Sequence, residues 1–383
     1  MQTIELESGP VRITGALDFD RSATGISPRR LPAWTRSQIT DLMTAAVVGL
    51  PSGVRLEFVT DANEIELHVQ TITTVFGDGP IPTAVFDLVV DDVLVEHQVA
   101  VGGNRLIVNP ANNAFSMQKS SPPTLRFKKL GSKLKRVELW LPANANVELR
   151  ALRISNGASI ALAPASIRRR WVHHGSSISH CFEADAPTGT WPVVASRLAG
   201  VDVMNLGFGG SCHLDQFTAR TIRDLPADVI SLKVGINVVN GETLKERTFG
   251  PALHGFLDTV RDGHPYTPLL VISPIICPTA ENHPGPTVPD VKGVFRVVER
   301  PAALMEGCLT LRRIREIIAE AVEKRRALGD TNLHYLDGLE LFGEGDVSDL
   351  PDGLHPNPAG YQRMGERFQA LAFGEGGMFA LED

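Results

Sequence analysis

Two residues near the C-terminus stand at a spacing that suits acyl-transfer chemistry. Asp352 precedes His355 by three positions, in the segment Asp-Gly-Leu-His-Pro. A carboxylate placed there can hold one imidazole nitrogen, which leaves the other nitrogen free to take a proton from a hydroxyl group. Taken alone, the pair also fits an ordinary surface loop, so its meaning depends on a nucleophile elsewhere in the chain.

A candidate nucleophile occurs in the segment Gly175-Ser176-Ser177, directly after the short strand-like run 171–174. A serine on a tight turn past the end of a strand can expose its hydroxyl and aim its backbone N–H at the same space. Ser177 is the favoured nucleophile, and Ser176 is its rival. The alternative interpretation is an ordinary Gly-Ser-Ser loop.

Two further segments place hydrogen-bond donors after predicted strands. Segment 205–210 ends in Gly209 and Gly210, and adjacent glycines let backbone N–H groups approach a ligand closely. Asn237 follows Gly235, and its side-chain amide could donate a hydrogen bond into the same space. Each segment also fits a tight turn or a helix cap, so neither is specific by itself.

The elements that would position these residues alternate between apolar strands and amphipathic helices after Pro164. Further buried strands are predicted at 201–206, 229–233, 269–273 and 333–336, and helices at 191–198, 213–223, 251–261, 309–328 and 359–372. This rhythm predicts a parallel sheet with helices on both faces. Ligands bind such sheets at the carboxyl ends of the strands, where the candidate residues stand. The irregular stretch 274–307 is long enough to be a functional loop.

The first part of the chain has a different pattern. Residues 1–165 contain many short runs that alternate between apolar and polar residues, separated by turn-rich segments. This period of two predicts antiparallel strands in an all-β, jelly-roll-like sandwich, with one short helical turn within 35–48. The sequence thus predicts two domains, a β-sandwich at 1–165 and a catalytic α/β domain at 166–383. A lid and a carbohydrate-binding module are the two roles considered for the sandwich.

The ordered set of four segments resembles the SGNH hydrolases, also called the GDSL family, over roughly residues 168–372. The family's blocks begin with Gly-Asp-Ser, then Gly, then Gly-x-Asn, then Asp-x-x-His. The matching residues here are Ser177, Gly210, Asn237, Asp352 and His355. Two positions depart from the family pattern. Ser176 stands where the family has an aspartate before the nucleophile, and Val238 stands where an aspartate often follows the Asn of the third block. Neither lost carboxylate is the triad acid, so the departures bear on the support of the two loops.

The resemblance implies a three-layer α/β/α sandwich and a serine acyl-enzyme mechanism. His355 would act as the base for Ser177, with Asp352 behind the histidine. The N–H groups of Ser177 and Gly210 and the amide of Asn237 would form the oxyanion hole. The reaction would need no metal and no organic cofactor, although an acyl-CoA could serve as co-substrate. The expected partners are a small-molecule acyl donor and a hydroxylated acceptor.

Other residues are weaker candidates for the site. Ser176, His174, Glu281 and His283 are considered as pocket-lining residues from their positions beside the serine loop or in the long irregular stretch. His173, His174 and His180 bracket the serine loop, but they lack an acidic partner at metal-site spacing, so no metal is expected. Asp346 and Asp349 are minor alternatives to Asp352 as the orienting acid.

Composition limits the classes of partner. The 383 residues carry a net charge of −7 and show no basic run, which argues against nucleic acid. No stretch approaches the roughly 18 apolar residues of a membrane span. The N-terminus lacks the pattern of a secretion signal, and the four cysteines show no metal or redox spacing. We therefore expect a cytoplasmic protein with free thiols; the sequence leaves the oligomeric state open.

The residues leave open whether water or another hydroxyl collects the acyl group. The layout resembles family members that transfer a salicylyl group to a tetracycline-type polyketide, and others that hydrolyse sugar esters. The absence of a signal sequence, the extra β-domain and the long insertion favour transfer of an aryl acyl group from a CoA thioester to a natural-product hydroxyl. The alternatives are a carboxylesterase or deacetylase and a non-catalytic glycan-binding protein.

Overall fold

The computed structural model describes residues 1–77, 79–109, 112 and 114–380. Within them the chain forms two compact units. The first comprises residues 1–36, 48–167 and 185–188, and the second comprises 37–47, 168–184 and 189–383. Each unit has its own sheets, and each is described separately below.

The first unit is built from two largely antiparallel sheets. The larger sheet runs in the order β10-β9-β6-β13-β4-β3, with β1 on β13 and β11 on β6. Its strands are β1 (Gln2–Ile4), β3 (Asp18–Arg21), β4 (Ile26–Arg29), β6 (Glu64–Phe76), β9 (Asn104–Val108), β10 (Phe115–Gln118), β11 (Thr124–Lys128) and β13 (Ala145–Ile154). The smaller sheet runs β14-β5-β12-β7-β8, with β2 on β5. Its strands are β2 (Arg12–Thr14), β5 (Arg55–Thr60), β7 (Val85–Val90), β8 (Val93–Val99), β12 (Lys135–Trp140) and β14 (Ile160–Leu162).

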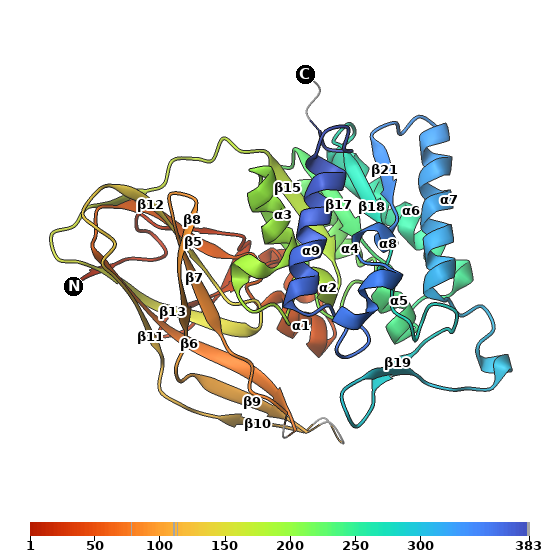
Figure 1. The fold of residues 1–383 in the computed structure, drawn as a ribbon, viewed down its shortest axis with the longest axis horizontal. Coiled ribbons are helices and arrows are strands. Elements are labelled where there is room, and N and C mark those ends of the chain that lie inside the picture. Colours follow the sequence, from red (N-terminus) through yellow and green to blue (C-terminus); the bar gives the residue numbers. More distant parts are fainter. Residues whose placement is uncertain (78, 110–111, 113, 381–383) are drawn as a thin grey trace. The chain divides into compact units, whose positions relative to one another are not determined.

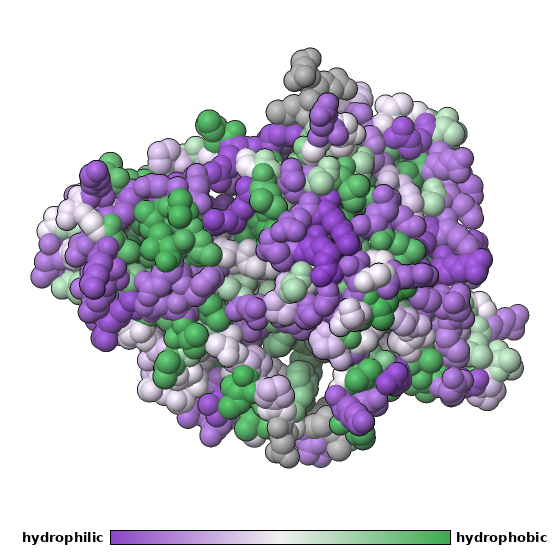
Figure 2. Space-filling model, in the orientation of Figure 1, coloured by the Kyte–Doolittle hydropathy of each residue, from purple (hydrophilic) through white to green (hydrophobic). Residues whose placement is uncertain are grey.

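One apolar core holds these two sheets together. Phe58 and Leu139 of the smaller sheet share it with Leu67 and Leu149 of the larger sheet, and all four are fully buried. The alternation of buried and exposed positions along the strands produces this core, because successive side chains of a strand point to opposite faces. The edge strand β8 is the exception, since it exposes several valines and Leu94; Figure 2 shows this apolar area over β8.

The second unit contains a sheet of parallel strands in the order β16-β15-β17-β18-β21. The strands are β15 (Arg170–Gly175), β16 (Asp202–Gly207), β17 (Val229–Lys233), β18 (Leu269–Ile272) and β21 (Leu333–Leu336). The helices are α1 (Leu42–Val48), α2 (Ser177–His180), α3 (Trp191–Ala199), α4 (Gln216–Asp224), α5 (Ile236–Gly241), α6 (Glu246–Gly263), α7 (Leu311–Ala327), α8 (Gly338–Leu341) and α9 (Pro358–Phe368). Short 3-10 or π turns lie at 33–37, 187–189, 302–304, 344–349 and 369–373.

The strand order explains why helices cover both faces of the parallel sheet. The chain moves from β15 to β16 in one direction, and then returns past β15 to β17, β18 and β21. Since such crossovers are right-handed, the reversal puts α3 on one face and α4, α6 and α7 on the other. Figure 1 shows α3 beside α9, which contact each other, and α6 contacts both α4 and α7. The reversal also creates a switch point after β15 and β17, where open sheets bind ligands.

The fold class predicted from the sequence is confirmed, an α/β parallel sheet preceded by an all-β region. The units nevertheless exchange two segments relative to a simple division at 165: residues 37–47 join the second unit and 185–188 join the first. Both exchanges bring together parts that are distant in sequence, which periodicity does not reveal. The helix predicted to start at Pro251 begins instead at Glu246, because Lys245 and Thr248 cap it one turn earlier.

Candidate active site

Ser177 is held by a short helix that leaves the end of β15. Ser176 is the N-cap of α2, and its hydroxyl accepts a hydrogen bond from the Ile178 N–H at 3.3 Å. The end of β16 lies directly against this helix, since a Cβ on Gly207 would lie 2.5 Å from the backbone nitrogen of His180. The absence of a side chain at Gly207 therefore lets two strand ends converge around the serine loop.

A chain of hydrogen bonds runs from this serine to a carboxylate. The Ser177 Oγ lies 2.9 Å from the His355 Nε2, and the His355 Nδ1 lies 2.6 Å from the Asp352 Oδ2. The other oxygen of Asp352 accepts from the N–H groups of Leu354 at 2.9 Å and of His355 at 2.7 Å. The carboxylate is thereby fixed in the orientation that keeps the Nδ1 protonated and leaves Nε2 to accept the serine proton.

Nearby charges tune the histidine. Burial alone would lower the pKa of His355, but the carboxylates of Glu183 and Asp352 outweigh it, and the pKa is raised. Burial would raise the pKa of Asp352, whereas its hydrogen bonds and attraction to His355 lower it. The site thus holds an ionised acid beside a more basic imidazole, which is what proton abstraction from a hydroxyl requires.

The predicted oxyanion donors lie in the glycine loop after β16 and in the first turn of α5, and Asn237 of α5 contacts the end of that loop. The Oδ1 of Asn237 accepts from the Cys212 N–H at 3.1 Å, which leaves the NH₂ end of this side chain as the donor. The glycine loop runs close to the nucleophile, because a Cβ on Gly209 would lie 3.7 Å from the Ser177 Cβ. Gly210 has a φ of +68°, a conformation that favours glycine. These positions support the predicted roles of Gly210 and Asn237, which stay predictions.

An apolar side chain that is distant in sequence lies beside the glycine loop. A Cβ on Gly210 would lie 3.6 Å from the Cγ of Met43 on α1, which places this helix against the glycine loop. Met43 is 57% exposed and Leu42 is 86% exposed. Since α1 precedes the parallel sheet by more than a hundred residues, the local pattern gave no signal of this contact.

The long irregular stretch contributes a second neighbour. It contains a hairpin of β19 (Thr287–Pro289) and β20 (Phe295–Val297). The ring of Phe295 stands edge-on to the His355 imidazole at 5.6 Å, and its N–H donates to the Asp352 carbonyl at 2.8 Å. The unusual length of the insertion was the one signal in the sequence, and it did not single out Phe295.

Two of the predicted pocket residues, Ser176 and His174, are fully buried, and these two predictions are corrected, whereas those for Glu281 and His283 stay predictions. Ser176 is fully buried as the cap of α2. His174 is buried in the core, where it contacts the Leu206 carbonyl, the Cys212 sulfur and the ring of Phe256. Glu281 forms a largely buried ion pair with Arg315 at 2.6 Å, because a buried carboxylate needs an opposite charge. The remaining candidate, His283, bonds the Pro284 carbonyl at 2.8 Å and lies 3.6 Å from Glu299, so its pocket role stays a prediction.

The alternative acids are also excluded by their partners. Asp346 accepts from Arg363 at 2.8 Å and from Arg367 at 2.6 Å, and Asp349 accepts from Arg363 at 2.6 Å. Both carboxylates therefore bind arginines of α9. The carboxylate that binds the imidazole is Asp352. No group of metal-binding side chains occurs among the described residues.

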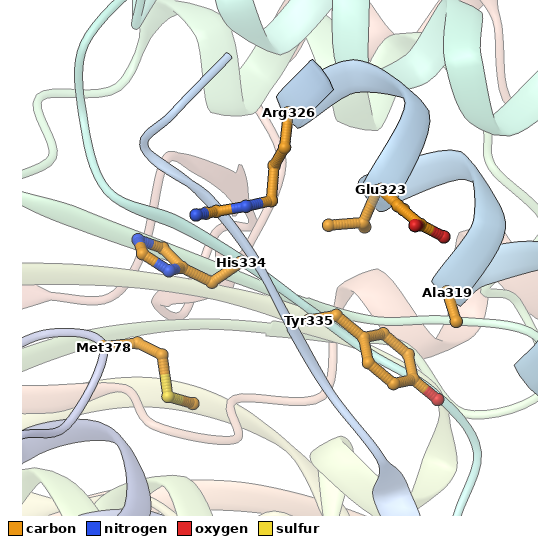
Figure 3. A pocket seen from close by; sticks show the side chains of 7 residues that line it. Ala319, Glu323, Arg326, His334, Tyr335 and Met378 are labelled. Atoms are coloured by element: carbon orange, nitrogen blue, oxygen red, sulfur yellow. The ribbon is translucent and has the colours of Figure 1, made fainter. Parts of the chain in front are cut away.

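A hollow of about 420 Å³ lies apart from the triad, between α7 and β21. Figure 3 shows its lining residues, Ala319, Val322, Glu323, Arg326, His334, Tyr335 and Met378. Two of its polar side chains bind within the protein, since Arg326 donates to the Thr331 carbonyl and Tyr335 donates to Ser273. In the part of the chain that the structure describes, no helix is both long and apolar enough to cross a bilayer.

Comparisons with known proteins agree with the geometry. The family model of the GDSL-like lipase/acylhydrolase family matches residues 174–363. No curated protein sequence matches the chain. Among solved structures, the salicylyl-acyltransferase SsfX3 from a tetracycline biosynthetic pathway is similar with a TM-score of 0.79 and 26% identity, over 96% of this chain and 95% of that chain.

Two carbohydrate esterases of family two share the fold. An active-site mutant from Clostridium thermocellum has a TM-score of 0.59 and 14% identity, over 94% of this chain and 96% of its own. The enzyme from Cellvibrio japonicus has a TM-score of 0.57 and 14% identity, over 96% of both chains. These similarities span both units. With the family match and the four motif segments in place, residues 174–363 belong to the GDSL-like lipase/acylhydrolase family.

Proposed function

We propose that this protein is an acyltransferase that forms an acyl-Ser177 intermediate and passes the acyl group to a hydroxyl of a second substrate. The observation that carries the proposal is the hydrogen-bond chain from Ser177 through His355 to Asp352, with separations of 2.9 and 2.6 Å. That geometry favours catalysis over the alternative of a non-catalytic glycan-binding protein.

The proposed reaction proceeds in two halves. The Ser177 Oγ attacks the carbonyl carbon of a thioester while its proton moves to the Nε2 of His355. Donors from Gly210 and Asn237 meet the oxyanion, the C–S bond breaks, and His355 returns the proton to the leaving thiolate. In the second half the acceptor hydroxyl gives its proton to His355 and attacks the acyl carbon. The bond from this carbon to the Ser177 Oγ then breaks, and His355 returns the proton to that oxygen.

Two observations favour transfer over hydrolysis. The similarity to the salicylyl-acyltransferase extends over almost the whole of both chains at 26% identity. Apolar side chains also flank the catalytic loops, with Met43 beside Gly210 and Phe295 beside His355. Such side chains suit an aromatic acyl group and reduce the access of water to the acyl-enzyme. By analogy with that relative, an aryl thioester of coenzyme A is the proposed donor and a polyketide hydroxyl the proposed acceptor.

Competition between water and an acceptor tests the proposal. The protein is incubated with salicylyl-CoA, with and without a polyhydroxylated aromatic acceptor, and products are followed by mass spectrometry. The expected result is an acyl adduct on Ser177 and an acylated acceptor, both absent with Ser177→Ala. An adduct that yields free acid alone with every acceptor would assign the protein as an esterase. Failure of both salicylyl-CoA and a fluorophosphonate to label Ser177 would overturn the acyl-serine mechanism.

A further inference from the structure

A second carboxylate faces the same nitrogen of His355 that Asp352 binds. The Oε1 of Glu183 lies 3.7 Å from the Nδ1, compared with 2.6 Å for the Oδ2 of Asp352. Glu183 comes from the segment just after α2, whereas Asp352 comes from the loop before α9. The imidazole is therefore approached by negative charge from two separate parts of the catalytic unit.

Glu183 is held in place by a buried tyrosine. The hydroxyl of Tyr361 on α9 donates to the other carboxylate oxygen of Glu183 at 2.7 Å. Tyr361 is fully buried, and burial followed by the nearby Glu183 raises the pKa of its hydroxyl well above the ordinary value. The tyrosine thus stays a neutral donor, and it fixes one oxygen of Glu183 while the other remains near His355.

We infer that Glu183, anchored by Tyr361, is a positioning residue that shares with Asp352 the stabilisation of the His355 imidazolium. The inference rests on the proposed function and deepens it. When Ser177 attacks, its O–H bond breaks and the proton moves to Nε2, while the Nδ1 proton stays on the ring. Both carboxylates face the Nδ1 side of the resulting positive charge, so both favour the transition state over the neutral resting site.

The other groups around His355 do not replace this role. Ser177 occupies the Nε2 side, and Phe295 is an uncharged neighbour at 5.6 Å. On the Asp352 side, Cys277 bonds the Gly353 carbonyl, and burial raises the pKa of its thiol to about 12, so it is neutral in the working range. The pKa of His355 is raised by the carboxylates of Glu183 and Asp352, which lie on separate segments of the chain.

The central test is Glu183→Gln, which keeps the shape of the side chain and an oxygen for the Tyr361 hydroxyl but removes the charge. The readout is the pH dependence of kcat/KM for release of p-nitrophenol from a small p-nitrophenyl ester, where the acidic limb reports His355 in the free enzyme. Because the lost charge raised the pKa of His355, the limb should move to lower pH, by about 0.5–1 unit. At the plateau kcat should fall about 3- to 10-fold with KM nearly unchanged.

Two further variants sharpen the test, and the first of them, Tyr361→Phe, keeps the inference falsifiable if Glu183→Gln folds poorly. Tyr361→Phe retains the carboxylate but releases it, so the limb should move in the same direction by a smaller amount. In an Asp352→Asn background, Glu183→Gln should lower kcat by a larger factor than in the wild type, since the second carboxylate then carries the imidazolium alone. Thermal unfolding of each variant verifies the fold.

Distinct outcomes separate this inference from the proposed function. If the wild type acylates Ser177 but Glu183→Gln leaves the acidic limb in place, Glu183 is a structural residue and the inference is wrong. Two results together would also reject the inference. The acidic limb of kcat/KM would be unchanged in folded Tyr361→Phe, and Glu183→Gln would lower kcat by the same factor in the Asp352→Asn background as in the wild type. If the wild type never acylates Ser177, the proposed function itself fails.

Discussion

The two units handle their buried polar groups in different ways. In the β-sandwich, buried charges pair with each other: the Arg55 Nε lies 2.6 Å from Glu57, and Trp140 donates to Glu138 at 2.9 Å. In the catalytic unit, buried polar groups near the carboxyl ends of the strands connect to the functional loops, as when Asn205 donates to the Ser179 carbonyl at 2.9 Å. A closed charge cluster stabilises its own sheet, whereas a network that ends at a loop positions a nucleophile.

The largest effect on activity is expected at the proposed nucleophile. Ser177→Ala removes the attacking oxygen and should lower kcat/KM by at least about 10⁴-fold, because the remaining site keeps only binding and the oxyanion donors. The rate is measured with a p-nitrophenyl ester, and thermal unfolding should be unchanged within a degree or two. A variant that keeps more than a tenth of the activity would transfer the role to another residue, with Ser176 as the first to examine.

The sandwich should respond in the opposite way, with a loss of stability and no loss of chemistry. Arg55→Met removes the buried partner that lies 2.6 Å from Glu57, and it removes the guanidinium that lies 4.6 Å from the Trp140 ring. The more exposed Arg136, 3.6 Å from Glu57 and 3.2 Å from Glu138, still compensates part of the negative charge. The free energy of unfolding, measured in urea, should fall by about 2–4 kcal/mol, because a charge-assisted hydrogen bond and a cation–π contact are lost. The double variant Arg55→Met/Glu57→Leu should recover part of this loss. A change below about 1 kcal/mol would contradict the stabilising role of the cluster.

The oxyanion donor gives a smaller but sharper test. Asn237→Ala should lower kcat by about 10²- to 10³-fold, since one preorganised donor is lost. Asn237→Asp is the matched control, because it preserves an oxygen for the Cys212 N–H but removes the NH₂ donor. Both variants should be impaired under the proposed role. Restoration of activity by Asp alone would show that Asn237 merely supports the loop.

The smallest expected effect concerns a buried amine in the catalytic unit. The Nζ of Lys233, at the end of β17, is fully buried and has no hydrogen-bond partner among the described residues. Burial lowers its pKa from 10.5 to about 8. Below pH 8 both the folded and unfolded states bind the proton, so the cost to stability is then complete. Lys233→Met should therefore raise the free energy of unfolding at pH 7 by about 3 kcal/mol.

The pH dependence provides the check on this prediction. Between pH 8 and 10.5 the unfolded state binds more protons than the folded state, so the free energy of unfolding of the wild type should rise with pH. The advantage of Lys233→Met should shrink over that range. The exposed Lys324→Met is the control, with no expected change in stability. A constant advantage across this range would attribute the gain to packing instead of charge.

The residues that the sequence identified best are those whose roles depend on short-range spacing. Asp352 and His355 lie three positions apart, and the loop between them turns so that one carboxylate oxygen meets the backbone and the other meets the ring. Patterns of apolar residues likewise predicted the antiparallel and the parallel sheets, because the periods of strands and helices depend only on residues that are close in sequence. The predictions were wrong where a residue's type and its position next to the serine were taken to place it in a pocket. Ser176 is a helix cap, and His174 is a core residue.

By itself, the sequence determined the class of fold and predicted the candidate nucleophile, base and acid, since each stands directly after a predictable strand or within one short motif. Only the tertiary structure decided which distant groups surround them. Met43, Glu183 and Phe295 reach the catalytic loops from a helix before the sheet, a segment after α2 and a hairpin in the insertion. The physical reason is that these contacts depend on strand order and loop closure, which bring residues together irrespective of their spacing along the chain.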